Sequence, residues 1–152
     1  ELVVISSAST YELMDAGGGR LEEGFEEAWA EAFTTYLQRM GEEAPVIVIA
    51  DTPRVGYDPA ECLATSEGIE DCDVSRERMV DEAYAELEAE AVTTAGAGLV
   101  SAADWICFEK DCPLVRGDLL TYRDSHHLSA TFAARLAERL GVAFDSVIRG
   151  GD

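Results

Sequence analysis

Basic residues are scarce in this sequence. Only 11 lysines and arginines stand against 31 aspartates and glutamates in 152 residues, which gives a formal net charge of −20. A chain of this charge repels polyanions, and no stripe of basic residues offsets the effect, so nucleic acid and an anionic membrane surface are excluded as partners. We interpret the acidity as a solvated surface rather than as a site for a particular cation.

Long apolar runs are also missing. The longest strongly apolar stretch is residues 46–50, far short of the roughly 20 residues that a membrane helix needs. The sequence shows no signal peptide and opens on Glu1 rather than methionine, so we expect a processed or excised piece of a longer protein. Hydrophobic residues make up 47% of the chain, which is enough for a core. No repeat or shift in composition divides it, and we expect one domain over residues 1–152.

The four cysteines include no Cys-x-x-Cys pair, which argues against a zinc ribbon or a dithiol redox motif. They form two local pairs, Cys62 with Cys72 and Cys107 with Cys112, and each pair flanks loop-like sequence. Local pairing predicts two small disulfide loops; other pairings and four separate buried thiols are the alternatives. Disulfides persist only in an oxidising compartment, so we expect the domain to work outside the cytoplasm.

What the sequence does contain is an alternation of short apolar runs with longer helical patterns. Residues 2–6, 46–50 and 99–101 are typical of buried parallel strands. Apolar residues three or four apart predict helices over 21–40, from Ser75 to about residue 91, and after Ser129, with Ser75 and Ser129 as caps. The aromatic stripe of the first predicted helix, formed by Phe25, Trp29, Phe33 and Tyr36, is interpreted as packing in the core. This order predicts an α/β fold with a parallel sheet between helices.

In proteins with an open parallel sheet, ligand-binding and catalytic residues lie at the carboxyl ends of the strands. Asp51 and the polar residues 6–10 each follow a predicted strand, and the turn 124–127 follows a turn or short strand expected at Leu119-Leu120-Thr121. We expect all three at this edge. Ser6, Ser7 and Ser9 are candidates for contacts with an oxyanion or a substrate, although capping and loop hydrogen bonds are the favoured roles. No glycine-bounded elbow surrounds them, which argues against a nucleophile there.

Residues 122–129 contain both histidines of the chain. Asp124 precedes His127 by three residues, a spacing at which a carboxylate in a tight turn can accept a hydrogen bond from one ring nitrogen. The other nitrogen is then free to take a proton from a nucleophile. We therefore expect Asp124 to orient the ring and His127 to act as the base. His126 is the less favoured base, since adjacent residues at the start of a helix point in different directions.

Two other interpretations of this tract stay open. Asp124, His126 and His127 could ligate zinc or iron, but neighbouring ligands rarely converge on one ion and the chain has no third histidine, so we expect no metal. The tract could also be a solvated turn without chemistry. Arg123 is expected to pair with a neighbouring carboxylate rather than with a substrate.

Taken in their order along the chain, these features resemble those of the C-terminal two-thirds of an SGNH-hydrolase-like domain. The resemblance covers nearly all of the chain, and its sharpest element is the D-x-x-H-L tract of Asp124, His127 and Leu128. Supporting features are Val3-Val4-Ile5 followed by serines, the run from Pro45 to Pro53, the paired cysteines and Cys112-Pro113. The closest type is the domain fused behind the membrane part of acyltransferase family three proteins, which O-acylate cell-surface glycans.

The resemblance implies a three-layer α/β sandwich of the SGNH, flavodoxin-like type. It implies that Asp124 and His127 are two members of a Ser-His-Asp triad, which transfers an acyl group, most simply acetyl, to a carbohydrate hydroxyl or hydrolyses it. The implied partners are a carbohydrate acceptor, an acyl donor and the membrane acyltransferase part. The implied location is extracytoplasmic and tethered to the membrane, and the chemistry requires no cofactor.

The sequence departs from the family pattern at the nucleophile. The family serine stands in a Gly-Asp-Ser block at the end of the first strand, whereas Gly117-Asp118 is followed here by leucine and Gly151-Asp152 ends the chain. We therefore expect the serine and the first strand of the sheet to lie outside these 152 residues. The alternatives are a non-catalytic glycan-binding or docking module that keeps the fold and, as a third choice, a secreted esterase.

Overall fold

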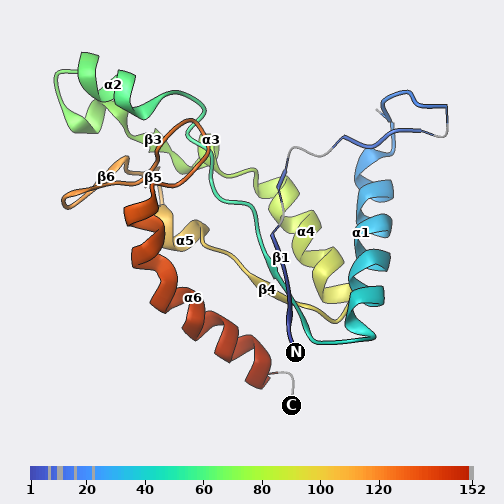
Figure 1. The fold of residues 1–152 in the computed structure, drawn as a ribbon. Coiled ribbons are helices and arrows are strands. Elements are labelled where there is room, and N and C mark those ends of the chain that lie inside the picture. Colours follow the sequence, from blue (N-terminus) through green and yellow to red (C-terminus); the bar gives the residue numbers. More distant parts are fainter. Residues whose placement is uncertain (7, 10–11, 16, 22, 151–152) are drawn as a thin grey trace. The chain divides into compact units, whose positions relative to one another are not determined.

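The computed structural model describes residues 1–6, 8–9, 12–15, 17–21 and 23–150. Its elements are shown along the chain in Figure 1. Contacts between residues divide the chain into two compact units. The first comprises Glu1–Asp51, Ala83–Val100 and Phe144–Asp152, and the second comprises Thr52–Glu82 and Ser101–Ala143. The expectation of one domain over residues 1–152 stays a prediction.

A three-stranded parallel sheet forms the centre of the first unit. Its strands are β1 (Val3–Ser6), β2 (Val46–Ile49) and β4 (Gly98–Val100), in the order β1-β2-β4. Strands β1 and β2 are short runs of mostly apolar, β-branched residues, and β4 is the apolar run Gly-Leu-Val, as expected of strands in a parallel sheet. The three strands predicted from the sequence are confirmed to within one residue at each end, and the predicted α/β class is confirmed with them.

Helices α1 (Phe25–Gly41) and α4 (Glu82–Thr94) cover one face of this sheet. Because side chains alternate along a strand, Val46 and Val48 of β2 point to the same face, where they pack with Leu37 of α1 and Val92 of α4. On α1, the ring of Trp29 lies 4.8 Å from that of Phe33. Trp29 is buried and Phe33 packs against the core, as expected of the aromatic stripe, whereas Tyr36 is 48% exposed.

The last turns of α6 (Ala130–Gly150) lie against the opposite face. Gly98 of β4 has no side chain there, and a Cβ at this position would lie 2.0 Å from Cγ1 of Val147. The first unit therefore has three layers, with helices on both sides of a parallel sheet. Val4 of β1 points to the same face as Gly98 and is 45% exposed.

Two predicted helix starts are wrong. The first helix begins at Phe25 rather than residue 21, because Gly24 adopts a left-handed φ of 69° just before it; Glu22 lies outside the described residues. The helix predicted from Ser75 is broken into α3 (Arg76–Met79) and α4, with Val80 extended between them. Ser75 makes no side-chain cap bond and belongs instead to strand β3 (Val74–Ser75).

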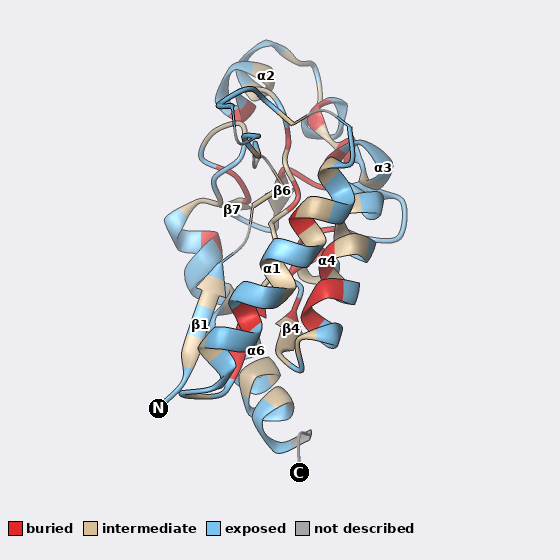
Figure 2. Ribbon diagram, turned by 90° about the vertical axis from the view of Figure 1, so that its right-hand side faces the viewer, coloured by how far each residue is buried: buried red, intermediate tan, exposed pale blue. Residues whose placement is uncertain are grey.

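The second unit is built around a core of its own. Its buried members include Tyr122, Leu114, Ile106, Met79 and Phe132, and Figure 2 shows where buried residues lie along the ribbon. Around this core are two short antiparallel pairs and four short helical segments: β3 with β5 (Asp111–Cys112), β6 (Val115–Arg116) with β7 (Leu119–Leu120), α2 (Pro59–Thr65), η1 (Ile69–Cys72), α3 and α5 (Ala103–Ile106). The segment between Cys62 and Cys72, expected to be loop-like, therefore contains the end of α2 and all of η1.

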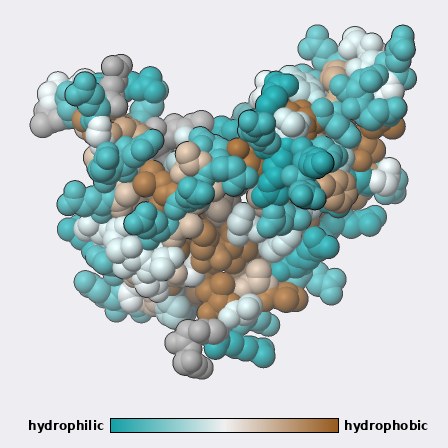
Figure 3. All heavy atoms as spheres, turned by 180° about the vertical axis from the view of Figure 1, so that it is seen from behind, coloured by the Kyte–Doolittle hydropathy of each residue, from teal (hydrophilic) through white to brown (hydrophobic). Residues whose placement is uncertain are grey.

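Both expected disulfides, Cys62–Cys72 and Cys107–Cys112, are present in the second unit. Cys72, Cys107 and Cys112 are buried in its core, and Cys62 packs against it, so both bridges lie in the interior of this unit. In the part of the chain that the structure describes, no helix is long and apolar enough to cross a membrane. Figure 3 shows hydrophilic side chains over much of one face of the molecule, which agrees with the formal net charge of −20.

Candidate functional site

A buried tyrosine anchors the histidine tract within the second unit. Tyr122 has 0% exposure, and its hydroxyl donates a hydrogen bond to the carbonyl of Pro53 at 2.6 Å. Tyr122 also forms an isolated antiparallel bridge with Leu128, and the backbone N–H of Arg123 donates to the carbonyl of His127 at 2.8 Å. Residues 123–127 therefore form a short loop that is closed at its base on a rigid part of the core.

Ser129 fixes the other side of this loop. Its hydroxyl accepts a hydrogen bond from the backbone N–H of Phe132 at 3.2 Å, so the predicted cap of α6 is confirmed. The same hydroxyl donates to the carbonyl of Leu120. The start of the helix is thus joined to the end of β7, with the two histidines between them.

Asp124 holds His127 by both its backbone and its ring. Oδ1 of Asp124 accepts the backbone N–H of His127 at 2.8 Å and that of His126 at 3.1 Å. The ring Nδ1 of His127 lies 2.9 Å from Oδ2 of Asp124 and 3.0 Å from Oδ1. With an ionised carboxylate as acceptor, Nδ1 carries the proton and Nε2 keeps its lone pair. This geometry can orient an imidazole that accepts a proton at Nε2.

The carboxylate of Asp124 is strongly stabilised in its ionised form. Its pKa is lowered far below the usual range of an aspartate, first by the backbone hydrogen bond from His127 and next by that from His126. Hydrogen bonds from the His127 ring and the Arg123 side chain lower it further. Nη2 of Arg123 lies 3.1 Å from Oδ2 of Asp124, so Arg123 makes the local ion pair expected from the sequence.

His126 lies beside His127 instead of pointing away from it. The two ring centroids are 4.0 Å apart, so the expectation that the adjacent histidines diverge is wrong. The physical reason is the turn at Asp124, which binds both backbone N–H groups with one oxygen and curls the chain around the carboxylate. The ring of His126 makes its hydrogen bond to Ser125: its Nδ1 lies 3.0 Å from Oγ of Ser125 and 3.7 Å from Oδ1 of Asp124.

The histidine tract does not follow a strand of the parallel sheet, which corrects another expectation. The strand before it, β7, pairs antiparallel with β6 in a separate two-stranded ribbon. The tract is therefore positioned by the hairpin, the Tyr122 anchor and the start of α6. A strand of only two residues gives a sequence pattern too short to reveal its pairing partner.

Asp51 and Ser9, by contrast, do meet near the carboxyl ends of β1 and β2 in the first unit. The backbone N–H and the hydroxyl of Ser9 donate to Oδ2 of Asp51 at 2.8 and 2.9 Å. Ser9 thus makes the loop hydrogen bonds that the sequence favoured for these serines. Ser6 is the last residue of β1 and is exposed, and Ser7 lies outside the described residues.

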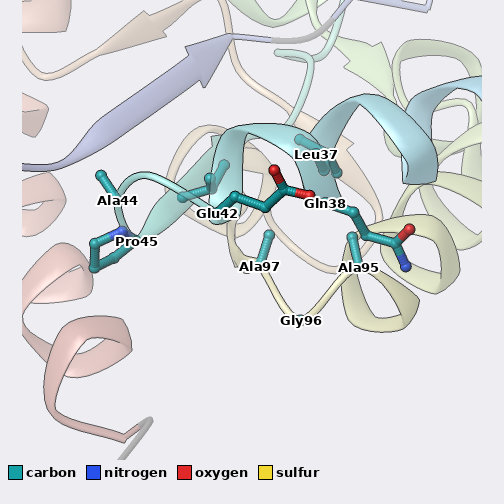
Figure 4. Close-up of a pocket in the computed structure, with 10 residues that line it drawn as sticks. Leu37, Gln38, Glu42, Ala44, Pro45, Ala95, Gly96 and Ala97 are labelled. Atoms are coloured by element: carbon teal, nitrogen blue, oxygen red, sulfur yellow. The ribbon is translucent and has the colours of Figure 1, made fainter.

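The described residues of the first unit line hollows at two places. The larger, of about 660 Å³, is lined by Ser9 and residues near the start of α1: Arg20, Leu21, Gly24, Phe25, Glu26 and Glu27. The smaller, of about 290 Å³, is shown in Figure 4, where Gln38 of α1 and Glu42, just after the helix, lie near the turn of Ala95 to Ala97. Because Val46 and Ala97 stand at the amino ends of β2 and β4, this second hollow is at the edge opposite to Asp51 and contains none of the expected site residues.

Comparison with models of protein families shows to which family the chain belongs. The model of the SGNH domain fused to AT3 domains matches residues 1–141, which include Asp124 and His127. The chain belongs to this family. Among solved structures, the SGNH domain is similar to the periplasmic domain of the lipopolysaccharide acetyltransferase of Salmonella ser. Paratyphi A, with a TM-score of 0.65 and 14% sequence identity. The match covers 95% of this chain and 56% of that one.

At this identity the structural likeness shows the fold, and it agrees with the predicted SGNH type of α/β sandwich. The chain spans a little over half the length of the structure that it matches. A search of curated proteins found no match.

Proposed function

We propose that this SGNH domain acts in O-acyl transfer to carbohydrate hydroxyls, or in hydrolysis of such esters, with His127 as the general base and Asp124 as the carboxylate that orients it. The observation that carries the proposal is the contact of 2.9 Å between Oδ2 of Asp124 and Nδ1 of His127. It is the hydrogen bond by which the aspartate of a Ser-His-Asp triad fixes the histidine tautomer.

The family supports acyl chemistry and a membrane partner. The family model describes an SGNH domain fused to AT3 domains, which supports the membrane acyltransferase part expected from the sequence. The structural neighbour is described as the periplasmic domain of a lipopolysaccharide acetyltransferase, which supports acetyl as the acyl group and a glycan as the acceptor. The two disulfides agree with an oxidising compartment, so the proposed location is outside the cytoplasm, tethered to the membrane in the full-length protein.

The proposed reaction has two steps. His127 takes the proton of a serine hydroxyl as the oxygen attacks the acyl carbonyl, and backbone N–H groups stabilise the tetrahedral oxyanion. His127 then returns the proton to the leaving group, and an acyl-serine ester remains. A sugar hydroxyl attacks this ester, and His127 accepts its proton and passes it to the serine oxygen as the acyl–oxygen bond breaks. The acyl group is then on the sugar, and the free serine is restored. If water attacks instead, the products are the free acid and the serine.

The serine of this mechanism is proposed to lie outside residues 1–152. Among the described residues, the ring of His127 contacts the carboxylate of Asp124 and the ring of His126, and neither group can serve as the nucleophile hydroxyl. Ser9 already donates its hydroxyl proton to Asp51, which leaves only acceptor capacity for a substrate. Ser6 and Ser9 therefore remain proposed contacts for substrate or oxyanion rather than nucleophiles.

Hydrolysis of an aryl acetate by the full-length protein tests the proposal. His127→Ala should lower kcat/KM by roughly a thousandfold or more, because the base of both steps is lost. His126→Ala is the matched control, and much of the activity should remain, because Nδ1 of His126 makes its hydrogen bond to Ser125 and not to Asp124. Full activity in His127→Ala would remove His127 from the mechanism.

The second candidate is a glycan-binding or docking module without catalysis. It is favoured by one observation: no Gly-Asp-Ser occurs in the 152 residues. The reading frame of the full-length protein separates the two candidates. A Gly-Asp-Ser shortly upstream of Glu1 favours the acyltransferase, and a frame without one favours the module. A secreted esterase, the third candidate, requires a signal peptide upstream in place of membrane helices.

A further inference from the structure

Asp124, His126 and His127 bring three metal-binding groups to one place on the second unit. Each residue offers one ligand atom, and these atoms lie within 4.8 Å of one another. The side chains are 35%, 47% and 56% exposed, respectively. The convergence was not expected from the sequence, and it arises because the turn at Asp124 places the two imidazole rings 4.0 Å apart.

The donor set suits Zn²⁺. Imidazole nitrogen and carboxylate oxygen are both common zinc ligands, with bonds of roughly 2.0–2.2 Å, which places tetrahedral ligand atoms roughly 3.4 Å apart. Nδ1 of His126 and of His127 lie 3.7 and 2.9 Å from the nearer oxygens of Asp124. Small rotations of the two exposed imidazole rings toward the half-buried carboxylate of Asp124 can therefore bring the ligands to bonding distance, and water can occupy the fourth position.

The surroundings favour binding in two further ways. The backbone of the loop is held by the Tyr122–Leu128 bridge and the hydroxyl of Ser129, so little backbone order has to be gained. The ring of His126 gives up only an exposed hydrogen bond to Ser125.

We propose that Asp124, His126 and His127 form a Zn²⁺ site whose occupation blocks the base of the acyl-transfer reaction. Zinc bound to a ring nitrogen of His127 and to the carboxylate of Asp124 takes both groups of the proposed base pair. His126 then has a role that catalysis does not give it, as the ligand that makes the site tridentate. The binding stands on the geometry alone, whereas the inhibition rests on the proposed function.

Isothermal titration of the full-length protein with ZnCl₂ at neutral pH tests the binding. The wild type should bind one Zn²⁺ at this site, and His126→Ala should weaken that binding by at least about tenfold, because one of three ligands is lost. Asp118→Asn, in the exposed turn between β6 and β7, removes the same charge as a change at Asp124 and should leave the binding unchanged.

Mg²⁺ separates this site from general attraction of cations to an acidic surface. Magnesium prefers oxygen ligands and should not compete for two imidazoles, whereas diffuse attraction by carboxylates should respond to either ion. Equal zinc affinity in the wild type and His126→Ala, or displacement of the zinc by an equal concentration of Mg²⁺, would overturn the proposal.

Aryl acetate hydrolysis by the same samples tests the inhibition. Zn²⁺ should suppress the wild-type rate with a midpoint near its binding constant, and EDTA should restore it. The activity that His126→Ala retains should need at least about tenfold more zinc for the same suppression. A protein that binds zinc through His126 but shows no hydrolysis contradicts the proposed function and leaves the site standing. Undiminished hydrolysis at saturating zinc contradicts the inhibition.

Discussion

Asp124 contacts His127 at two points. Its Oδ1 accepts a hydrogen bond from the backbone N–H of His127 at 2.8 Å, and its Oδ2 lies 2.9 Å from the ring Nδ1. The hydrogen bond to the backbone fixes the position of His127, and the ring contact fixes which ring nitrogen carries the proton. One carboxylate thus sets the shape of the loop and the orientation of the imidazole together.

Replacement of Asp124 should therefore impair catalysis more than a change of one surface charge would. In Asp124→Asn the side-chain amide can donate to Nδ1, which favours the wrong tautomer of His127. We expect kcat for aryl acetate hydrolysis by the full-length protein to fall by roughly 10³- to 10⁴-fold. Asp118→Asn is the charge-matched control and should keep wild-type kcat. Similar rates in the two variants would contradict the assigned role of Asp124.

The ionisation of Asp124 should affect stability in acid. Its folded-state pKa is lowered, so it contributes stability that is fully present above the unfolded pKa of about 4 and is lost as the pH falls from there toward the folded value. The difference in melting temperature between the wild type and Asp124→Asn should therefore be largest near neutral pH and shrink below pH about 4. A difference that grows on acidification would contradict the sign.

The same carboxyl group can be followed directly. In a ¹³C NMR titration, the side-chain carboxyl carbon of Asp124 should titrate at lower pH than those of exposed aspartates outside the loop, because its ionised form accepts two backbone N–H bonds. A midpoint in the ordinary aspartate range would show that these hydrogen bonds are not kept in solution.

Gly98 should tolerate no side chain while Val147 is opposite. A Cβ at Gly98 would lie 2.0 Å from Cγ1 of Val147 and 3.3 Å from its Cβ, and the branched side chain cannot swing clear as a flexible one would. We expect Gly98→Ala to lower the free energy of unfolding by about 1–3 kcal/mol, as overpacking does, measured by urea denaturation.

Two variants serve as controls for this change. Gly41, at the end of α1, has open space within 4 Å of the position that a Cβ would take, so Gly41→Ala should be neutral or slightly stabilising. Val147→Ala should recover part of the loss in a double variant with Gly98→Ala, because it removes the methyl group that clashes. Equal stability of Gly98→Ala and the wild type would place α6 differently against the sheet.

The disulfides should contribute strongly to the second unit. Cys62–Cys72 and Cys107–Cys112 join residues separated by 10 and 5 positions, and each bridge should stabilise the fold by about 2 kcal/mol. Reduction should lower the melting temperature, and an intact mass should show four fewer hydrogens than the reduced chain. Four free thiols in protein purified from its native compartment would contradict the extracytoplasmic location.

The sequence was most informative where local chemistry decides the structure. The strands β1, β2 and β4 have continuous apolar runs, and Ser129 has the side chain and position of a helix cap, so both were predictable. The turn at Asp124 was predictable for the same reason, because a carboxylate three residues before His127 can bind its N–H and its ring without any distant partner.

Tertiary contacts decided what the sequence did not reveal. The helix predicted from Ser75 is divided because Met79 is buried in the core of the second unit and Ser75 pairs with Asp111 in a two-residue ladder. The stacking of His126 on His127 depends on the curl of the chain around Asp124. Helix α2 did leave a signal, since Asp58 caps it and Pro59 stands at its first turn.

Strand β1 affects how readily copies of the protein associate with one another. Among the described residues it pairs only with β2, and neither charge nor proline interrupts its valines and isoleucine. Such an edge is a template on which strands of other molecules can add. The net charge of −20 opposes that addition by keeping copies apart, and salt screens this repulsion. The protein of residues 1–152 should therefore aggregate more readily as ionic strength rises. This is the opposite of a protein whose solubility increases with salt.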